Sequence, residues 1–307
     1  MVRPGRSWSE WLARSPPQAL FLVSAIFHYL GPSFAVLLFA RVEVLGVAWL
    51  RIATAAAVFS VWRRPWRLVL RLDRRDRWVL LQLGVVLAAM NSLFYLAVDR
   101  LPLSTVGAIE FLGTVLLAAW GIRTKRNVAA LALTTTGVGT MAQLRFVAEP
   151  LGFAFAFANC ALFLLYVILG HRIANNGDAG EATGRKVTYA IDQLGASMLI
   201  AAVAITPVGL GKALPALTDP ALLLAGAAVG VCSSVIPYVV DQLAMAQLPR
   251  ASFALMLALL PMFATLIGAV VLRQIPTLQE LAGVTLVMAG VALHQVSPDE
   301  RTRECTT

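Results

Sequence analysis

Long apolar segments, each about the length of a membrane-spanning helix, follow one another along almost the whole chain. A bilayer core about 30 Å thick needs roughly 20 mostly apolar residues per helix. The alternation typical of a transmembrane barrel strand is missing from these segments, so they indicate helices. The pattern predicts ten spans, at 19–40, 45–62, 78–98, 102–121, 128–144, 150–170, 187–210, 220–245, 249–272 and 276–295.

Composition strengthens this interpretation and argues against a soluble domain. The chain of 307 residues is 59% apolar and 13% charged, with a mean hydropathy of +0.78, values outside the range typical of soluble proteins. Between the spans we expect only short links, and beyond them only the tails 1–18 and 296–307. We therefore expect an all-α integral membrane protein with little room for a soluble catalytic module.

The N-terminal segment allows two interpretations. Three arginines precede the first apolar segment, as they would in a signal peptide. However, 19–40 is longer than the apolar core of a typical signal peptide, and a second apolar segment follows it at once. We expect a retained first span.

The positive residues are distributed unevenly between the two sides of the predicted bundle. Outside the spans, and counting Arg250 at the first turn of the ninth, 19 Lys and Arg fall on the side that holds both termini and 5 on the other. The positive-inside rule then predicts cytoplasmic termini in a bacterial inner membrane. A cluster of arginines in the link 63–77 determines this topology and allows contact with anionic lipid, and we expect no nucleic-acid partner. Its members are Arg63, Arg64, Arg67, Arg71, Arg74, Arg75 and Arg77.

The chain also contains an internal repeat. Leu101–Pro102 opens a span in one half as Leu248–Pro249 does in the other, and Gly137–Val138 matches Gly290–Val291. The repeats, 19–144 and 150–295, hold five predicted spans each. Because five is odd, the second copy enters the membrane from the opposite side, which gives an inverted pair suited to alternating access.

Several motifs carry a resemblance to a known family over nearly the whole chain. These motifs are 90–96 (MNSLFYL), 101–103 (LPL), 108–111 (AIEF), 47–51 running into 64–67, Gly152 with Tyr166 and 170–172, and 236–238 (IPY) with Asp241 and 248–249. On these motifs the sequence resembles the EamA family of the drug/metabolite transporter superfamily, in particular its threonine/homoserine exporters. Three positions depart from the family pattern, namely Phe163, Leu260 in Leu260–Pro261, and Arg273–Gln274.

The resemblance implies a secondary transporter that exports small metabolites, with threonine and homoserine favoured. Because the sequence contains no Gly-x-Ser-x-Gly elbow, phosphate-binding glycine loop or paired catalytic carboxylates, we expect no enzymatic activity. Exporters of amphipathic drugs or other metabolites, and a non-transporting scaffold or sensor, are the alternatives. We expect a small-molecule substrate, membrane lipids around the protein, a monomer or weak dimer, and no cofactor. Whether protons drive the transport is left open by the sequence.

Two ionisable residues at membrane depth are the first candidates for a binding site. Arg51 lies about six residues inside its span and Glu110 about eight inside its own, which places them at similar depths. A charged group there costs about 2.5–3.5 kcal/mol on insertion scales and tends to face a cavity or a partner. Glu110 could accept a substrate amine or a proton while Arg51 holds a carboxylate, or the two could form a structural ion pair.

Two neighbouring spans offer further polar candidates. Gly107, Gly113 and Thr114 form a small, polar stripe beside Glu110, suited to close helix packing or to ligand contact. Asn91 and Tyr95 lie one helical turn apart and suit either interhelical hydrogen bonds or a ligand.

The first span and the eighth complete the list of candidates. In the first, Pro32 should disturb the helix beside His28 and Tyr29, which could touch substrate or simply pack inside the bundle. In the eighth, the resemblance implies Tyr238 as a pocket aromatic.

The remaining charged residues, the cysteines and the histidines say less about function. Asp192 and Asp241 lie near cytoplasmic span ends, with Arg185 and Arg250 as possible partners or with solvent around them. The cysteines and histidines lack the spacing of a disulfide framework or a metal site. We expect no metal.

Overall fold

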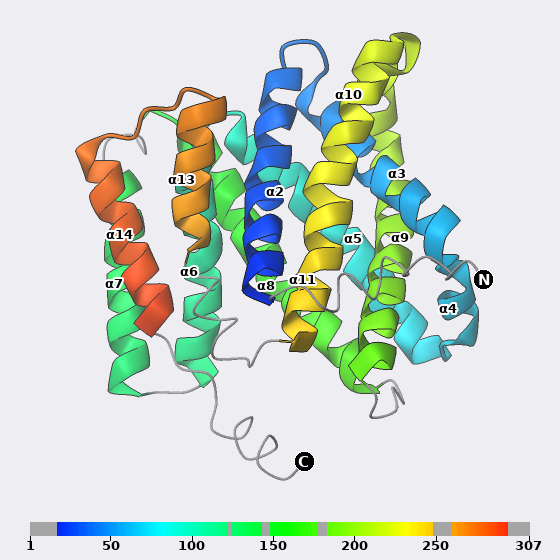
Figure 1. The fold of residues 1–307 in the computed structure, drawn as a ribbon, viewed down its shortest axis with the longest axis horizontal. Coiled ribbons are helices and arrows are strands. Elements are labelled where there is room, and N and C mark those ends of the chain that lie inside the picture. The colour runs from blue at the N-terminus through cyan, green and yellow to red at the C-terminus, as the bar shows by residue number, and fades with distance from the viewer. Residues whose placement is uncertain (1–16, 122–123, 143–147, 177–182, 248–258, 294–307) are drawn as a thin grey trace, which may run out of the picture.

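The computed structural model describes residues 17–121, 124–142, 148–176, 183–247 and 259–293. Over this part the chain is helical, and a helix lies on each predicted span (Figure 1). Of the ninth span, the structure describes only the second part, and Leu248–Pro249 lies outside the described residues. The helices are α2 (Pro17–Leu38), α3 (Val44–Arg63), α4 (Trp66–Arg71), α5 (Arg74–Val98), α6 (Leu103–Gly121), α7 (Lys125–Ala142), α8 (Pro150–Asn176), α9 (Thr183–Thr218), α10 (Pro220–Gly230), the π-helix η1 (Val231–Val235), α11 (Ile236–Gln247), α13 (Leu260–Val271) and α14 (Leu278–Leu293).

The length and apolar composition of the described helices are those of a membrane protein. Five described stretches are long and apolar enough to cross a bilayer unaided: Gln18–Leu38, Val44–Arg63, Arg74–Val98, Thr188–Thr218 and Pro220–Asp241. Shorter apolar stretches lie in α6, α8, α13 and α14. Many large apolar side chains on the outside are exposed, as expected where lipid is the solvent.

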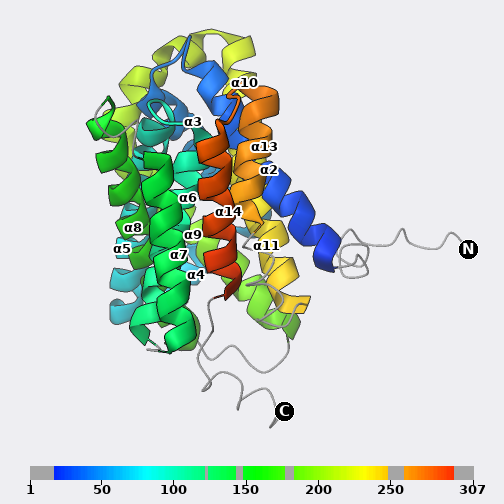
Figure 2. The same cartoon turned by 90° about the vertical axis from the view of Figure 1, so that its left-hand side faces the viewer.

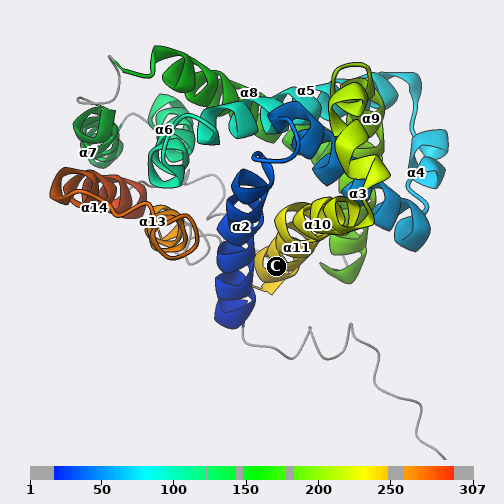
Figure 3. The same cartoon turned by 90° about the horizontal axis from the view of Figure 1, so that it is seen from above.

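The helices form two groups, and the three helices α2, α5 and α8 lie between them. Seen from above, α6, α7, α13 and α14 lie on one side, and α3, α4, α9, α10 and α11 on the other (Figure 3). Between them, α2 packs on α11 and α13, and α8 packs on α5 and α6. Figure 2 shows α7 and α14 running side by side on the face turned toward the viewer.

Helices α3 and α9 form a long antiparallel pair with an ion pair at each end. At one end Lys212 Nζ lies 2.9 Å from Glu43 Oε2. At the other, the Arg63 guanidinium donates to both oxygens of Asp192, at 2.7 and 3.2 Å. Asp192 therefore pairs with an arginine of the basic link, whereas the sequence suggested Arg185 or solvent.

The structure contains three local features that the apolar pattern does not predict. Residues 66–71 form the short helix α4 inside the basic link, after Arg64 ends α3 in the left-handed region with φ 52°. Helix α9 continues through Pro207 to Thr218, past the predicted end at 210. The eighth span is interrupted by the π-helix at Val231–Val235.

Helices α7 and α14 touch backbone to backbone where two glycines meet. A Cβ atom built on Gly137 would lie 2.6 Å from the carbonyl oxygen of Gly283, and one on Gly283 would lie 2.8 Å from that of Gly137. Contact this close requires residues without side chains, as is common between membrane helices.

Substituting these glycines tests the helix contact. Gly137→Ala should lower the melting temperature of the purified protein, because the added methyl group forces α7 and α14 apart. Gly139→Ala is the matched control, since its methyl group would meet nothing within 4 Å and alanine favours a helix by up to about 1 kcal/mol over glycine. Equal melting temperatures for the two variants would contradict the contact.

Candidate functional site

A small buried pocket lies at the centre of the molecule, where α2, α3, α5, α6, α8 and α11 meet. Its volume is about 50 Å³, which suits a few water molecules, so a larger ligand requires the surrounding helices to separate. The wall combines aromatic side chains with one guanidinium, one carboxyl group and two amides. Its residues are His28, Pro32, Arg51, Met90, Asn91, Phe94, Glu110, Asn159, Phe163, Tyr166 and Tyr238.

Arg51 is the most firmly held polar side chain of this pocket. It is 5% exposed, its Nε donates to Ser234 Oγ at 2.9 Å and its Nη2 to the carbonyl oxygen of Ser233 at 3.1 Å. A guanidinium has five N–H donors, so three remain for a ligand. The hydrogen bonds tie α3 to the π-helix of the eighth span.

The sequence around the π-helix explains why a backbone carbonyl is free to accept from Arg51. In an α-helix the carbonyl of Ser233 would receive the N–H of residue 237, but that residue is Pro237, which has none. Gly31 lets α2 pack on this segment, because a Cβ atom there would lie 2.7 Å from the Ser233 nitrogen. The break in the helix therefore creates the acceptor for the buried charge.

Helix α5 contributes two of the predicted site residues, in different roles. The Tyr95 ring lies under Arg51, with its centroid 5.2 Å from the guanidinium carbon, a cation–π contact. Asn91 lines the pocket, and its Nδ2 donates to Leu87 O at 2.8 Å within the helix. The amide oxygen and the second N–H of Asn91 thus remain for a ligand, whereas Tyr95 positions Arg51.

Glu110 faces the pocket from α6, beside residues of α8. It is 9% exposed, and Cys160 Sγ donates weakly to its backbone oxygen at 4.0 Å. The structure contains no salt bridge between Glu110 and Arg51, although both side chains are described. The structural ion pair, one of two alternatives from the sequence, is therefore not formed, because serines and an aromatic ring hold Arg51 instead.

Asn159 is the one amide among the pocket residues that the sequence analysis did not propose as site residues; the others are Met90, Phe94, Phe163 and Tyr166. Asn159 is 1% exposed, and its amide lies close enough to the Glu110 carboxyl group to interact with it, but neither of its polar atoms makes a hydrogen bond of regular geometry within the described structure. An amide without a well-formed hydrogen bond at such depth is costly. The available signal was a single amide inside the apolar run 150–170, and polar residues at membrane depth are often functional.

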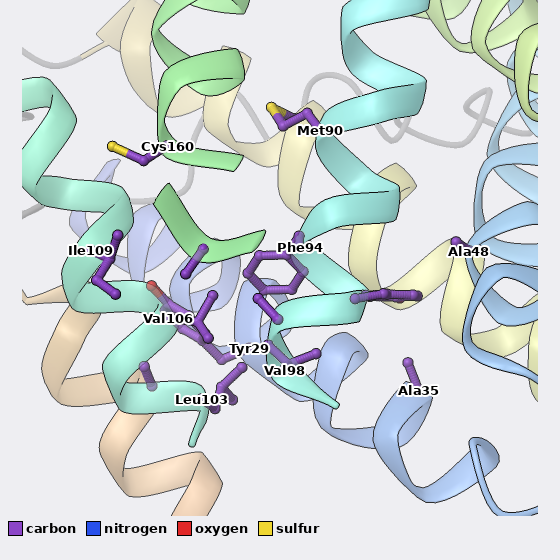
Figure 4. Packing of buried hydrophobic residues seen from close by; sticks show 14 of the residues in the cluster. Tyr29, Ala35, Ala48, Met90, Phe94, Val98, Leu103, Val106, Ile109 and Cys160 are labelled. Atoms are coloured by element: carbon purple, nitrogen blue, oxygen red, sulfur yellow. The ribbon is translucent and has the colours of Figure 1, made fainter. Parts of the chain in front are cut away.

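The remaining predicted residues divide between the pocket and the packing behind it. His28 and Tyr238 line the pocket. Tyr29 is fully buried behind His28, with ring centroids 5.3 Å apart, and packs against α6 among Leu103, Val106 and Ile109 (Figure 4). Thr114 belongs to α6, but its side chain lies outside the described residues.

The site offers recognition chemistry to a small polar molecule. Within the described segments, no three His, Cys, Asp or Glu side chains gather as metal ligands. The pocket does present positive N–H donors from Arg51 and a carboxyl group from Glu110, with aromatic walls between them. Such a wall can hold a ligand that carries both an acidic and a basic group.

Replacing a serine tests how Arg51 is held. Ser234→Ala removes the acceptor of Arg51 Nε and should cost on the order of 1.5–3 kcal/mol, as expected for a hydrogen bond to a charged group. Ser33→Ala is the control, because this equally buried hydroxyl donates only to Tyr29 O in its own helix. Chemical denaturation in detergent should find the first variant clearly less stable, and equal losses would contradict the anchoring role.

Known proteins similar to this chain include transporters. Residues 182–294 match the EamA-like transporter family. The chain is 29% identical over 291 residues to the threonine/homoserine exporter RhtA of Salmonella typhimurium, covering 93% of this chain and 92% of that protein. RhtA of Escherichia coli strain K12 is 29% identical over 289 residues, with the same coverage.

A solved structure supports the fold. The crystal structure of another protein has a TM-score of 0.56 to this chain at 18% identity, and the match covers 94% of this chain and 99% of that one. The similarity is one of fold alone. The chain is thus similar to the EamA-like transporter family over residues 182–294, and to threonine/homoserine exporters over nearly its whole length.

Proposed function

We propose that this protein is a secondary transporter that exports small amino acids, such as threonine or homoserine, from the cytoplasm. The observation that carries the proposal is the central pocket, with the guanidinium of Arg51 and the carboxyl group of Glu110 in one wall. An amino acid carries a carboxylate and an ammonium group a few bonds apart. The relatives named for threonine and homoserine export favour the same class of substrate.

In this proposal each end of the substrate has its own partner. The three N–H donors that Arg51 keeps free hold the carboxylate, since arginine suits planar oxygen pairs. Glu110 accepts from the ammonium group, and the amides of Asn91 and Asn159 serve the hydroxyl group of the side chain. Glu110 is also the group through which proton coupling would act.

The pocket lies between the two halves of the chain, as alternating access requires. Arg51, Asn91 and Glu110 belong to the first half, and Asn159 and Tyr238 to the second. Substrate bound between two bodies is exposed to either side when one rocks against the other. The small volume of the pocket corresponds to a state in which neither side is open.

The pattern of helix contacts supports ten spans arranged as two inverted repeats. Laying the repeats over each other equates α2 with α8, α3 with α9, α5 with α10–α11, α6 with α13 and α7 with α14. In that correspondence the contacts of α2 with α11 and α13 mirror those of α8 with α5 and α6, while α3 pairs with α9 and α7 with α14. Such reciprocity is expected of a two-fold axis in the membrane plane. In this topology both termini face the cytoplasm of a bacterium.

The test is flux of labelled threonine and homoserine through proteoliposomes of the purified protein, with and without a pH gradient. We expect saturable flux of both, competed by the unlabelled amino acid. An effect of the gradient beyond that of voltage alone would indicate proton coupling. Absence of flux for either amino acid would contradict the proposed substrates.

The Glu110→Gln variant tests the role of the carboxyl group. We expect its flux to fall by about tenfold or more, because a charge-assisted hydrogen bond contributes about 1.5–3 kcal/mol. The control is Glu43→Gln, whose exposed carboxylate pairs with Lys212 far from the pocket and should leave flux within about twofold, as expected for an exposed ion pair. Unchanged flux for Glu110→Gln, with the melting temperature preserved, would rule out the role.

A further inference from the structure

An apolar groove opens on the outer surface of the molecule, away from the central pocket. It lies between the short helix α4, the first turns of α5 and the middle of α9, and its volume is about 560 Å³. Helix α4 sits at the margin of the bundle next to α9 (Figures 1 and 3). The lining includes Trp66, Leu70, Val85, Leu199 and Val203, all without charge.

Helix α4 has an apolar stripe next to a basic one. Trp66 and Leu70, one turn apart, are 44% and 74% exposed and line the groove. Arg67 and Arg71, also one turn apart, are exposed on the neighbouring face. A helix with this division of residues lies in the interface of a membrane, with its basic face at the headgroups.

Some of the arginines beside the groove have no carboxylate partner. Arg63 pairs with Asp192, and Asp73 accepts from the backbone N–H of Asp76 at the start of α5. Within the described segments, the side chains of Arg67 and Arg71 make no salt bridge or hydrogen bond with another residue. Further arginines follow at 74, 75 and 77.

The dimensions of the groove match an acyl chain below a headgroup. Val85 lies eight residues after Arg77, which is about 12 Å along a helix. The groove therefore extends from the arginines into the hydrocarbon region. Trp62 and Trp78, just before and just after most of the link arginines in the sequence, are also exposed. Tryptophan is enriched at membrane interfaces.

We propose that this groove is a binding site for an anionic phospholipid. One acyl chain lies between α4, α5 and α9, and the phosphate is held by Arg67 and Arg71. The lipid fills the gap that α4 leaves against α9 and thereby stabilises the link between α3 and α5. The site is separate from the transport pocket and does not depend on its substrate.

The experiment compares phosphatidylglycerol with phosphatidylcholine of the same acyl chains, added to the full-length protein in detergent. Native mass spectrometry measures lipid retention, and the melting temperature measures stabilisation. We expect the wild type to retain phosphatidylglycerol preferentially and to melt at a higher temperature with it. Equal retention of both lipids would overturn the proposal.

Variants locate the site. Arg67→Gln/Arg71→Gln should weaken retention of phosphatidylglycerol by roughly 25-fold, because each positive residue near an anionic headgroup contributes a factor of about five. Arg67→Lys/Arg71→Lys should keep most of it, which separates loss of charge from loss of fold. Ala204→Trp, which fills the groove from α9, should lower the retention of both lipids.

The control neutralises two charges on another link of the predicted cytoplasmic side. Lys125→Gln/Arg126→Gln, at the start of α7, should retain phosphatidylglycerol as the wild type does. A loss as large as that of the Arg67/Arg71 variant would overturn the proposal, because the binding would then depend on diffuse charge. Unchanged retention in the Arg67/Arg71 or Ala204 variants would overturn it as well.

Discussion

The buried guanidinium of Arg51 is the constraint on which the centre of this molecule depends. An arginine at membrane depth costs about 2.5–3.5 kcal/mol on insertion scales, and the protein must compensate for it. Here compensation comes from Ser234, the carbonyl of Ser233 and the ring of Tyr95. These contacts join α3 to the eighth span and to α5, so the charge fixes three helices around the pocket.

Proline makes this arrangement possible because it releases backbone acceptors in mid-membrane. Pro237 leaves the carbonyl of Ser233 to Arg51, and Pro32 similarly withholds a hydrogen bond from the carbonyl of His28 at the pocket wall. Irregular backbone at this depth is tolerated where it lines a polar cavity. The central pocket and a point of irregular backbone thus coincide, as the proposed movement of the two halves about a central site requires.

The sequence predicted most of the helical architecture and part of the site. Apolar runs near 20 residues place helices well, because hydrocarbon thickness sets their length. Arg51 and Glu110 stood out because charge is rare at such depth. Their partners were not predictable, because hydrogen bonds from Arg51 to Ser234 and the proximity of Asn159 to Glu110 depend on how distant helices pack. The helix α4 was missed because its six residues are too short and too basic to form an apolar pattern.

The most direct test of the account is binding of threonine and its blocked derivatives to the purified protein, measured by isothermal titration calorimetry. The pocket is proposed to hold both charged ends of the substrate, the carboxylate at Arg51 and the ammonium group at Glu110. Threonine should therefore bind at least about tenfold more tightly than N-acetylthreonine or threonine amide, as loss of one charge-assisted hydrogen bond implies. Equal affinity for all three compounds would contradict recognition of the two charged ends.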